Sequence, residues 1–210
     1  MAVSRDDRGI PSPHEGIRRA VFLDRDGVLI EDRGPLADPD CIAILPGVPE
    51  ALARFRRAGY RLLVVSNQTV VSRGLLDERA MFELQGVVEG RIRAAGGPAL
   101  DGFYPCVHHP SATRPEYRRQ CDCRKPAPGL LRRAAEEHGV TLEQSLMVGD
   151  RPSDVAAGRA AGCATVQLRT GQHEAPPIEV PGGFEPVVPD FTFPDLLTAA
   201  RHFVPEEGAS

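Results

Sequence analysis

The sequence predicts an α/β fold, a three-layer α/β/α sandwich in which helices cover both faces of a parallel, Rossmann-like sheet. Short apolar runs alternate along the chain with amphipathic segments of helical period, which is the order that βαβ units produce. The runs are apolar throughout, as strands buried on both faces are. The chain has 210 residues, of which 41% are hydrophobic, so it can fill one core of this kind. We therefore expect a single domain.

Expected strands and helices follow one another in regular order. The expected strands are residues 20–23, 61–66, 145–148 and 164–168. The expected helices are residues 47–58, 77–95 and 128–138, a segment from Ser153 as N-cap to Gly162, and a last helix around 193–203. A glycine ends or follows each of the first four helices, as a typical C-cap. Residues 171–189 are dense in Pro, Gly and Glu and are expected to form a loop.

The terminal segments set the expected limits of the domain, and the net charge indicates which partners to expect. Residues 1–17 and 204–210 are expected to be disordered tails around a domain of residues 18–203. The net charge of −4 gives no electrostatic footprint for nucleic acid or an anionic membrane. No apolar run is long enough to cross a bilayer. We expect a cytoplasmic protein without nucleic-acid or membrane partners, and a monomer because no long apolar stripe is left over.

The most informative stretch is residues 20–30, where an apolar run stops at Asp24 and Asp26 with Gly27 behind them. Strand side chains alternate with period two, so the two carboxylates can point the same way. Carboxylates on one side repel each other unless a cation or a shared proton relieves them, which indicates a hard divalent ion such as Mg2+. The alternative is a simple turn, because Asp-Gly is common loop chemistry.

Three further polar clusters stand at expected strand ends or just before an expected helix, where ligands of open α/β sheets bind. They are Ser66-Asn67-Gln68, Cys121-Asp122-Cys123-Arg124-Lys125-Pro126, and Gly149-Asp150 with Asp154. Each alone can be read as a loop, a solvated charge or a turn. Their order and shared placement favour one site that combines a hydroxyl, an amide, a cation and a third carboxylate.

These clusters, from about residue 20 to residue 171, resemble the haloacid dehalogenase superfamily of phosphohydrolases. The resemblance implies that Asp24 attacks phosphorus to form an aspartyl phosphate. It implies that Asp26 protonates the leaving oxygen and then deprotonates the hydrolytic water, while Lys125 neutralises the phosphoryl oxygens. A carboxylate suits the first role because it is ionised at pH 7, and the covalent step avoids direct attack by water.

The resemblance also implies which groups hold substrate and metal. The implied substrate contacts are Ser66, the backbone N–H of Asn67, Gln68, Arg73, Arg124 and Arg151. Mg2+ would be held by the carboxylates of Asp24 and Asp150 and by the carbonyl oxygen of Asp26. Arg124 and Arg151 are the candidates for gripping a second phosphate group.

Cysteine spacing narrows the resemblance. Five cysteines are an odd number, and three of them lie within eighteen residues, which favours metal binding over disulfides. The stretches Cys106-Val107-His108-His109-Pro110 and Cys121-Asp122-Cys123-Arg124-Lys125-Pro126-Ala127-Pro128-Gly129 resemble the D-glycero-D-manno-heptose 1,7-bisphosphate 7-phosphatase family. The phosphatase portion of histidinol-phosphate enzymes shares these features. The resemblance implies a structural Zn2+ on Cys106, His108, Cys121 and Cys123 that pins a long loop, with His109 as an alternative to His108.

At other positions the sequence matches the family pattern in part and departs from it in part. Arg73-Gly74 and Arg169-Thr170-Gly171 fit, whereas Val28, Thr69-Val70-Val71 and Arg151 stand where members often carry Thr, a Ser-Gly-Ile-type stretch and Lys. The changes after Gln68 adjoin the expected pocket and leave the sugar and its anomer open. Residues 30–46 are expected to be only a loop, and residues 70–125 one helix plus the zinc loop, so no large cap domain is expected over the site.

The leading function is therefore Mg2+-dependent removal of the 7-phosphate of a heptose 1,7-bisphosphate. One rival is a histidinol-phosphate phosphatase, which needs acidic groups for the substrate ammonium. Another is a 3′-phosphatase on nucleic acid, which the acidic charge balance disfavours. A different class is a catalytically idle, zinc-stabilised binding module. The presence of Asp24, Asp26, Lys125 and Asp150 argues against it.

Overall fold

The computed structural model describes residues 18–175, 179–180, 183–184 and 187–205. The predicted N-terminal tail, and residues 206–210 of the predicted C-terminal tail, lie outside the described residues. Among the described helices, none has the length and apolarity needed to cross a membrane.

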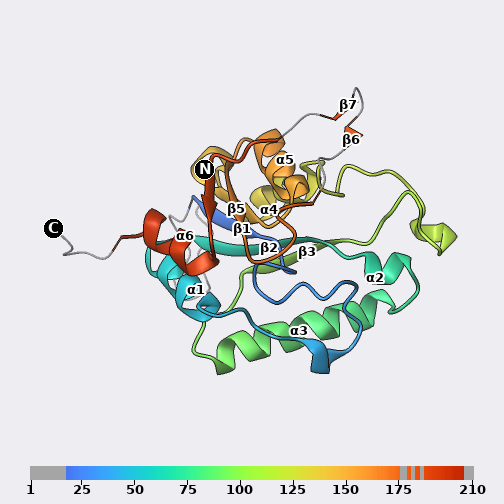
Figure 1. The fold of residues 1–210 in the computed structure, drawn as a ribbon, viewed down its shortest axis with the longest axis horizontal. Helices are drawn as coiled ribbons and strands as arrows, with labels where there is room; N and C mark the ends of the chain where they lie inside the picture. The colour runs from blue at the N-terminus through green and yellow to red at the C-terminus, as the bar shows by residue number, and fades with distance from the viewer. Residues whose placement is uncertain (1–17, 176–178, 181–182, 185–186, 206–210) are drawn as a thin grey trace, which may run out of the picture.

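Six of the described strands form one parallel sheet in the order β3-β2-β1-β4-β5-β8 (Figure 1). They are β1 (Ala20–Leu23), β2 (Arg61–Asn67), β3 (Gly102–Cys106), β4 (Leu146–Gly149), β5 (Ala164–Leu168) and β8 (Phe191–Phe193). Two short strands, β6 (Glu179–Val180) and β7 (Gly183–Phe184), pair with each other in antiparallel fashion. The parallel sheet confirms the predicted fold class.

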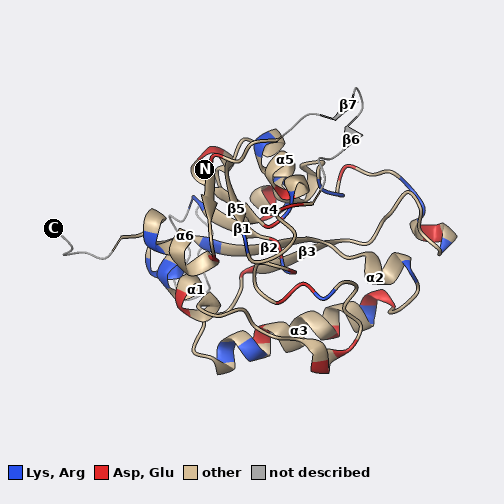
Figure 2. Cartoon of the chain, in the orientation of Figure 1, with Lys and Arg blue, Asp and Glu red and all other residues tan. Residues whose placement is uncertain are grey.

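Helices lie on both faces of this sheet (Figure 1). The α-helices are α1 (Val48–Arg57), α2 (Thr69–Ser72), α3 (Glu78–Ala94), α4 (Gly129–His138), α5 (Pro152–Ala161) and α6 (Leu196–Phe203). Three short 3-10 turns are η1 (Pro39–Cys41), η2 (Pro115–Tyr117) and η3 (Leu142–Gln144). Helices α1, α3 and α6 pack on one face, and α4 and α5 pack on the other. Charged residues of both signs lie along α1 and α3 (Figure 2).

The central strand β1 shows why these strands are apolar at every position. Val21 and Leu23 belong to the core on the α1 face, where they join Phe55, whereas Phe22 belongs to the core on the α4 face with Leu131. Because successive side chains point to opposite faces, a strand covered on both sides has no position that water reaches. This packing fixes the end of β1, and with it the residues that follow.

The structure corrects several element predictions. Strands β3 and β8 and helix α2 were not expected. Strand β3 reads Gly-Phe-Tyr-Pro-Cys and forms a sheet edge, the position where a proline without an N–H is tolerated. The N-cap of α5 is Arg151 rather than Ser153, because Pro152 starts the helix. Helix α6 begins at Leu196, after Asp195 caps it by accepting a hydrogen bond from Thr198 N. The predicted loop over 171–189 contains β6 and β7.

No large cap interrupts the described fold. The segment between β1 and α1 contains the single turn η1, and residues 68–128 contribute α2, α3, β3 and η2. The carboxyl end of the sheet is therefore bordered by loops and by the short helix α2. This agrees with the prediction from sequence.

Removal of the Phe22 ring should destabilise the fold. Phe22 is fully buried between the sheet and helices α4 and α5, so Phe22→Ala leaves a cavity. We expect the free energy of unfolding to fall by about 3–5 kcal/mol in chemical denaturation. Phe82→Ala is the matched control, because Phe82 is 50% exposed on α3, and its loss should be clearly smaller. Equal losses in the two variants would contradict this packing.

Candidate active site

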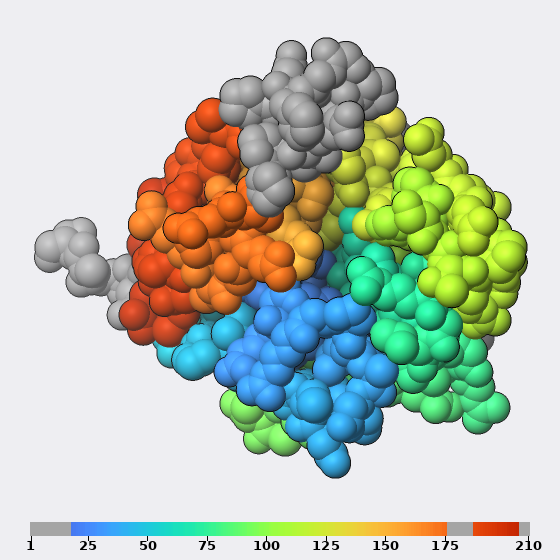
Figure 3. Space-filling model, turned by 45° about the vertical axis from the view of Figure 1, so that its right-hand side comes forward, coloured from blue at the N-terminus to red at the C-terminus, as the bar shows by residue number. Residues whose placement is uncertain are grey.

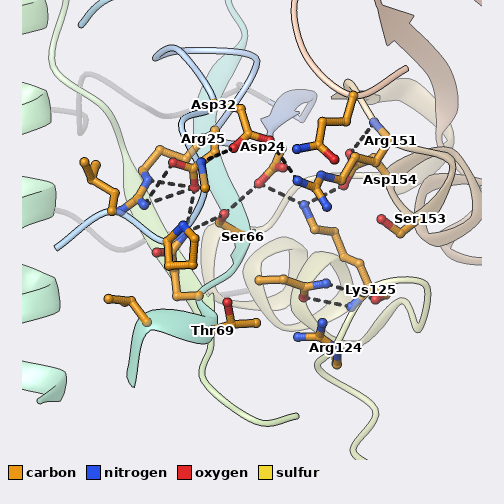
Figure 4. Close-up of a pocket in the computed structure, with 18 of the residues that line it drawn as sticks. Asp24, Arg25, Asp32, Ser66, Thr69, Arg124, Lys125, Arg151, Ser153 and Asp154 are labelled. Carbon is orange, nitrogen blue, oxygen red and sulfur yellow. Dashed lines mark hydrogen bonds and ion pairs between the residues drawn. The ribbon is translucent and has the colours of Figure 1, made fainter. Parts of the chain in front are cut away.

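The carboxyl ends of β1, β2 and β4 open into one pocket of about 590 Å³. Figure 3 shows the surface hollowed beside the blue segment that follows β1 and the teal segment around α2. The lining is mainly polar and charged, and Figure 4 shows these side chains pointing toward one another from several loops. Lys125 and Ser66 both lie near Asp24 in this view, as predicted.

Asp24 stands directly after β1, where its backbone N–H donates to the carbonyl of Val148 at 3.0 Å. Its carboxylate is nearly buried. Oδ1 accepts a hydrogen bond from the Ser66 hydroxyl at 2.6 Å and lies 3.0 Å from Lys125 Nζ. Both contacts fall on the same oxygen. Oδ2 therefore remains available for another partner.

Lys125 is buried among acceptors. Its Nζ lies 2.6 Å from Asp154 Oδ1 and 3.0 Å from Asp24 Oδ1, and it donates to the Val65 carbonyl at 2.8 Å. Burial by itself lowers the pKa of Lys125, but the two carboxylates outweigh it, and the net pKa is raised. The side chain is thus held as an ammonium ion. The Asn67 side chain fixes its backbone through hydrogen bonds to Lys125 N and O at 3.1 and 3.0 Å.

Asp150 follows β4 and forms a carboxylate cluster with Asp24 and Asp154. One oxygen of each lies within 4.8 Å of the others. Burial raises the pKa of Asp150 to about 7, and the charges on Asp24 and Asp154 add to the rise. Oδ2 of Asp150 accepts from Gln172 N at 2.6 Å, while its buried Oδ1 has no hydrogen-bond partner. Crowded, under-compensated carboxylates with an unpaired oxygen fit a hard divalent cation.

Two glycines make room for the Asp150 carboxylate. A Cβ atom on Gly27 would lie 2.5 Å from Asp150 Oδ2, and one on Gly171 would lie 2.2 Å from it. Any larger residue at either position would collide with this oxygen. Loops from β1 and β5 therefore close directly around the acidic group at the end of β4.

Asp26 is held from two sides. The Arg25 guanidinium donates to its Oδ2 from Nε at 3.2 Å and from Nη2 at 3.0 Å. The Gln68 amide donates to the same oxygen at 3.0 Å and to Ser66 Oγ at 3.0 Å. Burial raises the pKa of Asp26, and Arg25 partly offsets the rise. The Gln68 amide, predicted as a substrate contact, is occupied by Asp26 and Ser66.

Three arginines predicted to bind substrate line the pocket. Arg124, labelled in Figure 4, donates to the His108 carbonyl at 3.2 Å, which ties it to the cysteine-rich loop, residues 106–123. Arg151 pairs at 2.8 Å with Asp32, whose side chain is 4% exposed. Arg73 is exposed at the rim. The lining therefore offers cationic groups from three different segments of the chain.

The cysteine-rich loop gathers the four predicted zinc ligands. The Sγ atoms of Cys106, Cys121 and Cys123 lie 3.1–3.6 Å apart, and His108 Nδ1 lies 3.4 Å from Cys123 Sγ. Two sulfurs bound to one zinc ion at tetrahedral angles lie about 3.8 Å apart, so the cluster has the size of a zinc site. The three cysteines are free thiols rather than disulfides, and burial raises the pKa of the Cys106 thiol.

His109, the alternative ligand, faces elsewhere. It lines the pocket, and its Nδ1 accepts a hydrogen bond from Ser111 N at 3.0 Å. The described cluster contains His108.

Sequence reasoning missed roles for Asp154, Arg25 and Asp32. Asp154 was visible as an acidic residue near a helix start, but nothing in the sequence indicated its ion pair with Lys125. Arg25 stands between two aspartates, which was a usable signal. Asp32 had none, because its partner Arg151 is 119 positions away.

Known proteins show extensive similarity to this chain. A sequence model described as HAD-hydrolase-like matches residues 122–199. The D-glycero-beta-D-manno-heptose-1,7-bisphosphate 7-phosphatase of Photorhabdus laumondii is 40% identical over 73% of this chain and 81% of that protein. The phosphatase of the same name from Escherichia coli K12 is 38% identical over 76% of this chain and 84% of its own length.

A solved structure is similar over nearly its whole length. The D,D-heptose 1,7-bisphosphate phosphatase of B. bronchiseptica, complexed with magnesium and phosphate, has a TM-score of 0.73 and 30% identity. The match covers 88% of this chain and 97% of that one. This chain is a phosphatase, and it belongs to the heptose 1,7-bisphosphate 7-phosphatase family of haloacid dehalogenase-like hydrolases.

Proposed function

We propose that this enzyme removes the 7-phosphate of D-glycero-D-manno-heptose 1,7-bisphosphate through an aspartyl phosphate on Asp24. The observation that supports the proposal most directly is how the two oxygens of the Asp24 carboxylate are bonded. Ser66 and Lys125 both engage Oδ1, which orients the group and leaves Oδ2 free to attack phosphorus. Positioning of this kind supplies much of the rate in phosphoryl transfer.

The reaction then divides between Asp24 and Asp26. Asp24 Oδ2 forms a bond to phosphorus while the bond from phosphorus to the sugar oxygen breaks, and Asp26 donates a proton to that oxygen. Burial raises the pKa of Asp26 and so favours the protonated form that this step needs. Asp26 then takes a proton from water as the water oxygen attacks phosphorus. Phosphate leaves, and Asp24 is restored as a carboxylate.

Asp24, Asp150 and the Asp26 carbonyl oxygen would hold Mg2+, and the Asp154 carboxylate completes the acidic cluster. When bound, the ion supplies positive charge that neutralises the phosphoryl oxygens. Lys125, whose Nζ lies 3.0 Å from Asp24 Oδ1, contributes a second positive charge beside the nucleophile. On substrate binding, the Ser66 hydroxyl would turn its proton from Asp24 Oδ1 to an oxygen of the transferring group, and the backbone N–H of Asn67 would hold another.

The proposed zinc ion on Cys106, His108, Cys121 and Cys123 has a structural role. Four protein ligands close the coordination sphere and leave no position for substrate. The ion would fix the loop that leads directly into Arg124 and Lys125.

Arginines around the pocket support a bisphosphate over histidinol phosphate. A second phosphate can pair with Arg124 or Arg151, whereas the ammonium of histidinol phosphate would face these cations unfavourably. We propose that the enzyme acts as a monomer in the cytoplasm on this small substrate. The five free thiols are consistent with a reducing compartment.

Substitution of the nucleophile should stop turnover. Asp24→Asn is nearly isosteric but cannot attack, so phosphate release should be lost while circular dichroism stays unchanged. Asp26→Asn should lower the rate on a sugar phosphate by about 10²–10⁴-fold, and less on an aryl phosphate whose leaving group needs no proton. Turnover at the wild-type rate by purified Asp24→Asn would rule out the covalent mechanism.

Loss of a zinc ligand should be visible without any activity assay. We expect about one zinc ion per chain in metal analysis, and Cys121→Ser should lower both the zinc content and the melting temperature. Cys41→Ser is the control, since Cys41 is exposed and outside the cluster. A wild-type protein that binds no zinc and is as stable as Cys121→Ser would refute the site.

Arg124 tests the substrate assignment. Arg124→Ala should reduce kcat/KM on a heptose 1,7-bisphosphate by roughly ten- to a hundredfold, the scale of one or two charge-assisted hydrogen bonds. A simple aryl phosphate lacks the second anionic group and should lose much less. Arg132→Ala, on α4 outside the pocket lining, should change neither. If wild-type enzyme prefers histidinol phosphate to every sugar bisphosphate, the assignment is wrong.

A further inference from the structure

Arg25 is an arginine in an unusual place. Its side chain is 1% exposed, and it is among the largest fully buried side chains of the described chain. The guanidinium is committed to one neighbour, Asp26, through bonds from Nε and Nη2 to both carboxylate oxygens at 3.0–3.2 Å. A planar guanidinium in two-point contact fixes the orientation of a carboxylate as well as its position.

Stability alone does not account for this arrangement. Nη1 of Arg25 is buried and has no hydrogen-bond partner. A buried donor without a partner is destabilising, because the hydrogen bonds it made to water are not replaced. Replacement of a buried ion pair by apolar groups is often neutral or stabilising. Burial of the Arg25 guanidinium is therefore unfavourable for the free energy of folding. This cation nevertheless lies next to Asp26, the group that the proposed reaction needs as acid and base.

Gln68 holds Asp26 from the other side and connects it to the phosphate-binding residues. Its Nε2 donates to Asp26 Oδ2 and to Ser66 Oγ, both at 3.0 Å, and Gln68 is 3% exposed. Ser66 in turn donates to Asp24 at 2.6 Å. An unbroken chain of hydrogen bonds thus runs from the proton-transfer group through Gln68 and Ser66 to the nucleophile.

We propose that Arg25 and Gln68 are positioning residues that aim the Asp26 carboxylate at the oxygen of the leaving group. Neither touches the reacting atoms; each acts through Asp26. Gln68 also couples the placement of Asp26 to that of Ser66, so the acid and the phosphoryl-binding hydroxyl keep one relative geometry. This inference rests on the proposed phosphomonoester hydrolysis, but not on the identity of the sugar.

The test compares two leaving groups. An alkyl phosphate releases a poor leaving group that needs the Asp26 proton, whereas dinitrophenyl phosphate releases a good one that does not. Gln68→Met keeps the side-chain length, Arg25→Met leaves a shorter unbranched apolar side chain, and both remove the donors to Asp26. Each should lower kcat/KM on the alkyl phosphate by at least about tenfold more than kcat/KM on dinitrophenyl phosphate, within the range of general acid catalysis. This ratio reports formation of the phosphoenzyme and excludes its later hydrolysis, in which Asp26 acts as base for both substrates. Arg25→Lys, which keeps one charged donor, should recover part of the loss.

Two buried residues outside the pocket lining serve as matched controls. Arg54 and Gln85 are 6% and 2% exposed, so Arg54→Met and Gln85→Met impose similar burial changes. Both controls should keep the wild-type ratio of the two rates, even if their melting temperatures fall. Should Arg25→Met fail to fold, Gln68→Met alone decides the question.

Equal loss on both substrates in Arg25→Met and Gln68→Met would overturn the positioning role, since a general structural defect does not depend on the leaving group. The comparison uses whichever alkyl phosphate wild-type enzyme hydrolyses best. Preference for an alkyl phosphate other than a heptose bisphosphate would therefore overturn the proposed substrate, while the ratio would still test Arg25 and Gln68.

Discussion

The buried ammonium group of Lys125 is the interaction on which the rest of the site depends. It lies 3.0 Å from Asp24 and 2.6 Å from Asp154, so it joins the end of β1 to the start of α5. Asp150 joins these two carboxylates in one cluster, and Lys125 pairs with two of the three acidic groups. Burial, together with the charges of Asp24 and Asp154, raises the pKa of Asp150, and a divalent ion would relieve this crowding.

The position of Lys125 is itself fixed from two directions. On one side the Asn67 side chain binds its backbone N–H and carbonyl group. On the other, the cysteine-rich loop ends two residues earlier at Cys123. That loop closes tightly onto α4, where Gly129 N donates to the Asp122 carbonyl at 2.9 Å and a Cβ on Gly129 would lie 2.4 Å from that oxygen. A metal in the cysteine cluster would therefore stabilise the site without taking part in the reaction.

The structural features that the sequence predicts are those that depend on a local pattern of residues. Strand β1 and Asp24 were predictable because an apolar run that ends in carboxylates has few other interpretations. Strand β3 was missed because its Gly and Pro are poor strand formers, and pairing with β2 at a sheet edge overrides that preference. The partners of Gln68 and Asp154 could not be predicted, since side-chain contacts between distant segments exist only after the sheet has assembled.

Chemical trapping of the bond between Asp24 and phosphorus is the most direct measurement of the proposed covalent step. Borohydride reduces an acyl phosphate to an alcohol, so enzyme quenched during turnover and then reduced should carry homoserine in place of aspartate. Peptide mass spectrometry should find the change at Asp24 alone, and only when substrate is present. Reduction at Asp26 or Asp150 instead, or an unmodified Asp24 in enzyme that has released a burst of sugar product ahead of phosphate, would contradict this mechanism.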